Sequence, residues 1–136
     1  MKKNLLFITT LFLTITACGQ KTNGLKNTQQ MDTSKLKNET VKGAIDALQD
    51  KDSEKWLTYF TEDAKMTDDG KPRDFQSFSK DAVGNEWFTE IQRIENDGKD
   101  IYGHLTTKQW GDFDVYFKFH VNNEGKIHQL DIGQAK

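Results

Sequence analysis

Cys18 is the one cysteine among 136 residues, and the segment before it decides what its thiol can do. The chain opens with the cationic Met1-Lys2-Lys3, continues with an apolar run over residues 5–15, and reaches the cysteine through Thr16-Ala17. A short cationic start, about a dozen apolar residues and a small residue before the cut are typical of an export signal. The run is too short to cross a bilayer, which takes roughly 20 apolar residues. The segment is therefore predicted to be an export signal, which carries the protein and its cysteine out of the cytoplasm.

The four residues Ile15-Thr16-Ala17-Cys18 resemble the lipobox of bacterial lipoproteins. In that family the cysteine thiol receives a diacylglycerol, the signal is cut before the cysteine, and the new amino group is acylated, with chains such as palmitate. The resemblance implies a signal peptide over residues 1–17 and a stable membrane anchor at Cys18, since two or more acyl chains hold a protein on a membrane.

The resemblance also implies a location in the cell envelope. Gly19, instead of an aspartate, follows the cysteine. In enteric-type bacteria this favours the outer membrane, facing the periplasm, and in a bacterium with a single membrane the anchor would hold the protein on the outer surface. The alternative is an ordinary signal peptide with an incidental cysteine.

The charge balance of the predicted mature chain excludes one class of partner. Removing residues 1–17 leaves 119 residues and takes away two of the 19 basic residues, so 17 basic residues face 21 acidic ones, for a net charge of about −4. Nucleic acid binding usually requires a basic face and is not expected. With Cys18 acylated, no thiol remains for a disulfide or a cysteine-ligated metal. The sequence predicts no metal and no cofactor.

Residues 18–33 contain the predicted acylated cysteine and a stretch rich in Gly, Asn, Gln and Thr, without aromatic residues or periodicity. This composition predicts a flexible tether that spans on the order of 20 Å. Residues 34–136 are then about the size of one small domain.

Three helices are predicted for the first half of that domain. The first has an apolar stripe at helical spacing, the second starts at a capping residue and carries apolar residues inward, and the third is weaker and ends near a glycine. Their defining residues are Val41, Ala44, Ile45 and Leu48; Asp52 or Ser53 before Trp56, Leu57 and Phe60; and Ser77 to about Asn85 with Phe78, Ala82, Val83 and Gly84. A turn is expected at Asp68-Asp69-Gly70-Lys71-Pro72.

The second half of the domain alternates between apolar and polar residues, most clearly over residues 113–122, which is typical of half-buried antiparallel strands. Turn signals at Asp97-Gly98, Trp110-Gly111-Asp112 and Glu124-Gly125 divide the region into four strands. All three loops agree on one apolar face. The predicted pairs are Ile94 with Ile101; Leu105, Gly103 and Ile101 with Phe117, Phe119 and Val121; and Leu130 and Ile132 with Phe119 and Phe117.

This order of elements resembles the nuclear transport factor 2-like superfamily, and within it the SnoaL-like branch of polyketide cyclases and isomerases. The likeness covers about residues 34–134 and rests on short segments: Ala47-Leu48, Asp52-Ser53-Glu54-Lys55-Trp56, Phe60-Thr61-Glu62-Asp63-Ala64 and Asn123-Glu124-Gly125-Lys126-Ile127. It implies an α+β cone, with N-terminal helices packed in a curved antiparallel sheet and a conical cavity at one end. Members are enzymes, binding proteins or dimerisation modules, so the fold does not supply the function.

Three polar residues interrupt the predicted inner face: Glu90, Gln92 and His128. A carboxylate is buried unpaired only at a cost of several kcal/mol or with a large pKa shift. Glu90 is therefore expected either in a hydrated cavity or turned outward by a bulge. In a cavity, these three residues would contact a small, partly apolar ligand. Trp56 and Tyr59 are candidates for the cavity mouth, and Trp56 is also a candidate for core packing.

An enzyme is the alternative interpretation of the same residues. Glu90 and His128 have the chemistry of a base and its hydrogen-bonding partner, and Asp63 fits the family's turn after the second helix. The aspartate and tyrosine pair of the isomerases in this fold has no match on the predicted inner face. A binding or accessory protein is therefore favoured over an isomerase or cyclase.

The opposite face of the sheet carries Trp87, Ile91, Tyr102 and Tyr116, enough aromatic and apolar area to predict a homodimer interface. Superfamily members often dimerise through this face, and a structural dimer without a ligand is the third hypothesis. Histidines on this face are expected to form cross-strand polar pairs and not a metal site. The predicted register places Tyr102 opposite His120, and Lys118 between His104 and Asp131.

Overall fold

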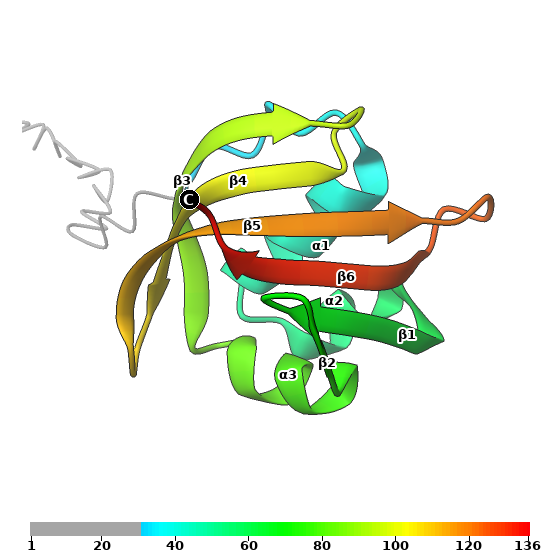
Figure 1. Cartoon of the computed structure of the whole chain (residues 1–136). Coiled ribbons are helices and arrows are strands. Elements are labelled where there is room, and N and C mark those ends of the chain that lie inside the picture. Colours follow the sequence, from blue (N-terminus) through cyan, green and yellow to red (C-terminus); the bar gives the residue numbers. More distant parts are fainter. Residues whose placement is uncertain (1–30) are drawn as a thin grey trace, which may run out of the picture.

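The computed structural model describes residues 31–136. The predicted signal peptide, Cys18 and most of the predicted tether fall on residues 1–30 and lie outside the described residues. The described part forms three helices and six strands (Figure 1): α1 Glu39–Gln49, α2 Ser53–Thr58, β1 Phe60–Asp68, β2 Lys71–Arg73, α3 Phe75–Ala82, β3 Glu86–Glu95, β4 Asp100–Thr107, β5 Gly111–Val121 and β6 Ile127–Gln134. Within this range no helix is long and apolar enough to span a membrane.

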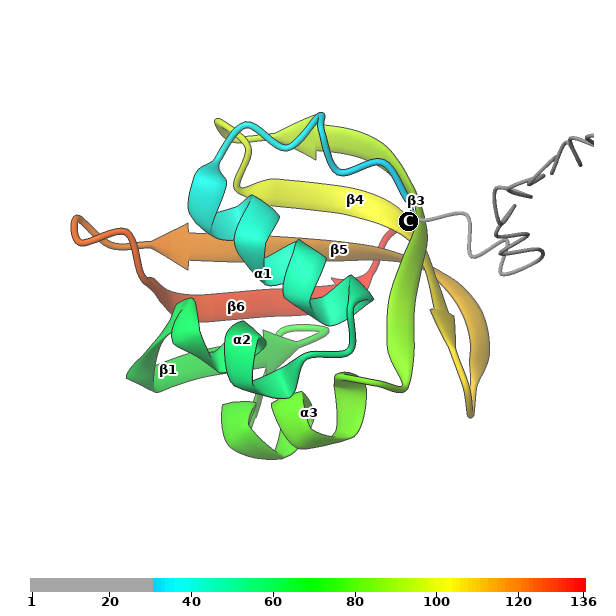
Figure 2. The same cartoon turned by 180° about the vertical axis from the view of Figure 1, so that it is seen from behind.

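The six strands form one curved sheet in the order β2-β1-β6-β5-β4-β3, and the helices lie against its concave side. Figure 2 shows α1 and α2 in front of this inner face, with α3 at one end of the sheet. In Figure 1 the outer face is seen without a helix in front of it, and β3, β4 and β5 bend around the helical layer. The predicted α+β arrangement, helices packed in a curved sheet, is confirmed.

Each helix begins at a side chain that caps its first turn. Asn38, Asp52 and Asp74 accept hydrogen bonds from the backbone N–H three residues later, at 3.1, 3.0 and 2.7 Å. Each bond satisfies a donor that the start of a helix leaves unpaired. Asp74 caps α3, so this helix covers Phe75–Ala82 instead of the predicted 77–85.

The second helix is shorter than predicted. It ends at Thr58, so Phe60 opens β1 instead of lying on the helix. Trp56 and Phe60 are buried as expected, but Leu57 is 38% exposed, so its predicted inward orientation was wrong.

Two of the three predicted strand registers are confirmed. Ile94 pairs with Ile101 across the first hairpin, where Asp97 and Gly98 both adopt positive φ as a tight hairpin turn requires. Across the last hairpin, Phe117 pairs with Ile132, and Phe119 with Leu130.

The middle register was wrong by four residues. The β4–β5 loop is residues 108–110, not 110–112, and Leu105 lies opposite Phe113 instead of Phe117. The Thr107 hydroxyl stabilises this earlier loop, because it accepts the Trp110 N–H at 2.8 Å and donates to the Gly111 carbonyl at 3.0 Å. An even shift turns no side chain over, so the predicted apolar face of these two strands survives the error.

The pairing of β1 has no signal in the sequence pattern. β1 runs parallel to β6, with Met66 beside Leu130 and Asp68 beside Ile132. It also forms a tight hairpin with β2 at Asp69-Gly70, where both residues have positive φ, which confirms the predicted turn. This hairpin brings β2 to the end of the sheet where α3 lies.

Aromatic side chains fill the space between the helices and the sheet. Trp56, Phe60 and Phe75 stack in sequence at centroid distances of 4.7 and 4.4 Å, and Phe88 contacts Phe117 edge to face at 4.9 Å. All five are buried. Burial of each large apolar side chain contributes about 1.5–3 kcal/mol.

Candidate ligand-binding cavity

The cone has a cavity of about 330 Å³ at the end of the sheet where β2, α3 and the β4–β5 hairpin meet. Its apolar walls come from the inner faces of β4, β5 and β6 and from α3: Phe78, Leu105, Phe113, Val115, Phe117 and Ile132. Its polar lining consists of Asp68, Asp69, Arg73, Glu86, Thr107 and Gln134. The lining is about evenly divided between apolar and polar surface. Small-molecule sites also combine apolar walls with polar groups that orient the ligand.

The alternation of the strands explains the apolar walls. Phe113, Val115 and Phe117 are spaced two residues apart on β5, so all three point to the concave side. The helices α1 and α2 cover the other end of this face, and the end near Phe113 is left open to the cavity.

Arg73 is the one basic residue in the cavity lining. It is paired with buried Met66 across the β1–β2 hairpin, and this register turns its side chain inward. Its Nη1 lies 2.8 Å from Oδ2 of Asp68, and its guanidinium lies 5.1 Å from the ring centroid of Phe78. The cation is therefore already engaged by an anion and an aromatic ring.

Glu86 is the first residue of β3 and lies opposite Thr107 of β4. It precedes buried Phe88 by two residues, so the pleat directs its half-buried side chain into the cavity. Burial raises the pKa of this carboxyl, the nearby Arg73 guanidinium lowers it in part, and Asp68 raises it further. Among residues 31–136 its carboxylate has no hydrogen-bond or ion-pair partner, unlike Asp68.

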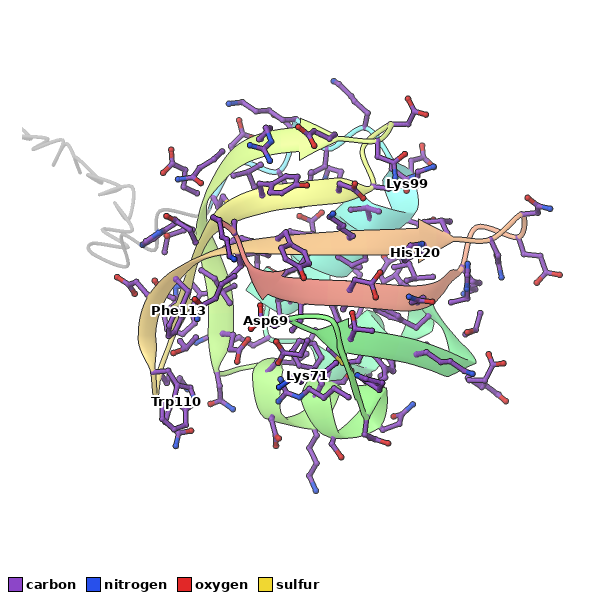
Figure 3. All side chains as sticks on the ribbon, in the orientation of Figure 1. Asp69, Lys71, Lys99, Trp110, Phe113 and His120 are labelled. Atoms are coloured by element: carbon purple, nitrogen blue, oxygen red, sulfur yellow. The ribbon has the colours of Figure 1, made fainter. Side chains whose placement is uncertain are left out.

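Trp110 stands at the tip of the β4–β5 hairpin beside the cavity. It is 69% exposed, and Figure 3 shows it at the free end of the hairpin, below Phe113. A large indole exposed beside a cavity is available to contact a ligand, because it combines a broad apolar ring with a polar N–H.

The structure places the three predicted inner-face polar residues elsewhere. Bulges in β3 after Phe88 and after Ile91 turn Glu90 to the outer face, opposite His104, and leave Gln92 exposed. A bulge in β6 leaves His128 exposed, with its ring centroid 6.1 Å from that of His120. The inner-face prediction for these residues was wrong, and the bulge alternative for Glu90 is what the structure shows.

The two aromatic residues expected at the cavity mouth do not line the cavity. Trp56 is fully buried and donates a 2.9 Å hydrogen bond from Nε1 to Oγ of Ser79, which fits its core-packing alternative. Tyr59 packs against Gly43 of α1. Glu86 and Arg73, which sequence reasoning missed, take the polar positions instead.

The outer face brings together only part of the predicted dimer surface. Tyr102 and Tyr116 are direct cross-strand neighbours, so the predicted pairing of Tyr102 with His120 was wrong. Arg93 stacks 3.8 Å from the Tyr102 centroid. Trp87 is half-buried, and Ile91 faces inward against the core because of the β3 bulge, which removes it from the outer surface.

Polar pairs, as predicted, occupy the rest of the outer face. His104 Nδ1 lies 2.9 Å from Asp114 Oδ1, and His120 Nε2 lies 2.7 Å from Asp131 Oδ2. Lys118 lies opposite Asp100 on β4 and Asp131 on β6 in the strand register, not opposite His104. The described residues contain no group of three or more candidate metal ligands. A wider outer groove of about 760 Å³ is lined by the two tyrosines, by charged residues and by Gln92, one of the residues predicted to contact a ligand. Its lining contains none of the phenylalanine, leucine, valine and isoleucine side chains that line the cavity.

Solved structures share this arrangement, although no protein-family model and no curated protein matches the sequence. The fold is the nuclear transport factor 2-like cone. A nuclear transport factor 2-like protein of unknown function from Cytophaga hutchinsonii is 14% identical with a TM-score of 0.59, and the match covers 78% of this chain and 92% of that chain. A proposed ketosteroid isomerase from Kribbella flavida is 14% identical with a TM-score of 0.58, over 75% and 79% of the two chains.

A proposed polyketide cyclase from Xanthomonas campestris is 16% identical with a TM-score of 0.54, and the match covers 76% of this chain and 93% of that chain. At these identities the likenesses show the fold alone. They agree with the α+β cone that the sequence predicted.

Proposed function

We propose that this protein is a lipid-anchored cell-envelope protein whose cone binds a small, partly apolar molecule. The observation that carries the proposal is the 330 Å³ cavity, whose lining combines aromatic and aliphatic walls with ionisable groups. The apolar part of a ligand would displace water from these walls. Each Å² of apolar surface removed from water contributes about 25 cal/mol of favourable binding free energy.

The cavity supports a binding role better than the predicted catalytic residues support an enzymatic one. Glu90, His128 and Asp63, the residues considered for an isomerase or cyclase, are exposed and do not line the cavity. β3 and β6, which carry Glu90 and His128, are separated in the sheet by β4 and β5, so these two residues are not neighbours.

The binding proposal is tested with the neutral fluorescent probe N-phenyl-1-naphthylamine, whose emission rises in apolar surroundings. Saturable binding to one site is expected. Val115→Phe places a larger side chain in the cavity wall and should weaken binding about tenfold, or 1.4 kcal/mol. Val121→Phe is the matched control, because Val121 lies at the other end of β5 outside the cavity lining. Equal effects of the two variants, or no saturable binding by the parent, would contradict the proposal.

The anchor is proposed from Cys18 and the three residues before it. Mass spectrometry of the mature amino terminus is expected to find an acylated Cys18. Cys18→Ser should move the protein from the membrane fraction to the soluble fraction of the producing bacterium. An unmodified cysteine, or a chain that starts at another residue, would rule out the anchor and leave the cavity proposal untouched.

A further inference from the structure

The carboxylates that line the cavity are not equivalent. Asp68 is paired with Arg73 at 2.8 Å, and Asp69 accepts the backbone N–H of Gln134 at 2.9 Å. Glu86 is half-buried in the same lining and has no such partner among residues 31–136. With one guanidinium against three carboxylates, the cavity carries an excess of negative charge, and Glu86 is the carboxylate without a direct partner.

Leaving Glu86 unpaired has an energetic cost that a ligand can remove. A carboxylate that loses part of its hydration is destabilised unless an opposite charge replaces the lost water. Arg73 supplies this compensation only in part, because its guanidinium is paired with Asp68 and lies over Phe78. A positive group placed beside Glu86 would supply it.

The surroundings of Glu86 also define the rest of such a ligand. Phe78, Phe113 and Phe117 provide the apolar walls, and the exposed indole of Trp110 stands at the mouth (Figure 3). Aromatic faces attract cations as well as apolar rings, and this attraction strengthens when the cation loses water. The lining therefore suits a molecule with a flat apolar body and a cationic group.

We propose that the cavity selects amphipathic cations, namely aromatic or otherwise apolar amines whose protonated nitrogen pairs with the Glu86 carboxylate. This inference rests on the proposed binding function and names its ligand class. Anionic molecules of the same size are disfavoured by Glu86 and by the engagement of Arg73 with Asp68.

The test uses three naphthalene probes of nearly equal size that differ in charge: 1-naphthylmethylamine, 1-naphthalenemethanol and 1-naphthoate. Affinities are measured by calorimetry at neutral pH with the described domain, or with the full mature chain in detergent. The amine is expected to bind about tenfold more tightly than the alcohol, the difference that 1.4 kcal/mol represents, and the carboxylate is expected to bind most weakly.

Two isosteric variants separate the cavity from the general field of an acidic protein. Glu86→Gln should remove the preference for the amine while leaving the affinity for the alcohol within about twofold. Glu90→Gln removes the same charge from the outer face of the same strand and should leave all three affinities unchanged. Circular dichroism confirms that each variant is folded.

The outcomes distinguish this inference from the function on which it rests. Binding of none of the three probes overturns both. Binding of the alcohol with no preference for the amine, or a preference for the carboxylate, overturns the inference and leaves the binding function standing. An equal loss of amine affinity in Glu86→Gln and Glu90→Gln also overturns it, because the preference would then come from net charge and not from the cavity.

Discussion

The side-chain amide of Gln49 pairs with both backbone groups of Phe88. Its Nε2 donates to the Phe88 carbonyl at 2.8 Å, and its Oε1 accepts the Phe88 N–H at 2.7 Å. β3 is an edge strand, so these groups have no neighbouring strand on that side. The last residue of α1 thus takes the place of a strand at one position, and it does so where the β3 bulge begins.

We expect Gln49→Ala to destabilise the domain by about 1–3 kcal/mol, because it leaves two partly buried backbone groups without partners. Urea unfolding measures the loss, and hydrogen exchange should show faster exchange of the Phe88 amide. Gln76→Ala on α3 is the control, since this glutamine is exposed and should change stability by less than about 0.5 kcal/mol. Similar losses in the two variants would show that the pairing with Phe88 contributes nothing specific.

A second prediction concerns the contact between α1 and the residue after α2. A methyl group on Gly43 would overlap the ring of Tyr59. In an unhindered helix Gly→Ala stabilises by up to about 1 kcal/mol, but here the overlap should make Gly43→Ala destabilising by about 1–3 kcal/mol.

A double-mutant cycle checks the cause of that sign. In a Tyr59→Ala background the ring is gone, so the same Gly43→Ala change should become neutral or stabilising. Urea unfolding of the four proteins gives the coupling. A destabilisation that persists without the ring would place the obstruction elsewhere.

Much of the fold follows from periodicity and turn chemistry. The stripe from Val41 to Leu48 and the alternation over 113–122 predict the helix and strand faces, and the glycine turns at 98 and 125 predict two hairpin registers. Even the four-residue error between β4 and β5 preserved the faces, because the side-chain period is two. The Thr107 hydroxyl, which stabilises the actual loop, has no signature in the pattern.

The candidate site was less predictable, because bulges reset the alternation. Counting by twos from Phe88 toward Glu90 crosses the first β3 bulge and fails at once. Counting backward from Phe88 crosses no bulge and leads directly to Glu86, so the signal for this residue was present at the beginning of the strand. The position of Arg73 in the cavity lining depends on the β1–β2 hairpin and on the parallel pairing of β1 with β6. No local sequence pattern indicates that parallel pairing.

A third prediction concerns His104, whose pKa is raised, mainly by the hydrogen bond to Asp114 and further by the nearby Asp112. Because the folded pKa lies above the unfolded one, the pair stabilises the fold fully below the unfolded pKa. This stabilisation is lost as pH rises through the folded pKa.

Asp114→Asn should therefore lower the pKa of His104, as followed by the chemical shift of its ring proton. It should also reduce thermal stability at mildly acidic pH more than at alkaline pH. Asp100→Asn is the control, because Asp100 lies on β4, the strand of His104, but opposite Lys118. A His104 titration that is unchanged in Asp114→Asn would contradict the assignment.

The final prediction concerns Glu86, the half-buried carboxylate of the cavity. Its folded pKa is raised, first by burial, with Asp68 and Asp81 adding to the shift and Arg73 opposing it. The ionised carboxylate is therefore less favourable in the folded domain than in the unfolded chain, so stability falls as pH rises from the unfolded pKa through the folded one. Glu86→Gln carries no charge and should escape this loss.

The melting temperature of Glu86→Gln should exceed that of the parent at neutral pH, and the difference should shrink toward acidic pH as Glu86 is protonated. Glu90→Gln, which changes the same residue type on the exposed outer face, should show no such trend. Saturating 1-naphthylmethylamine should raise the melting temperature of the parent more than that of Glu86→Gln, since the amine compensates a charge that only the parent carries. A Glu86→Gln difference that is constant with pH would mean that the fold does not destabilise this carboxylate, and the reason for a cationic ligand would disappear with it.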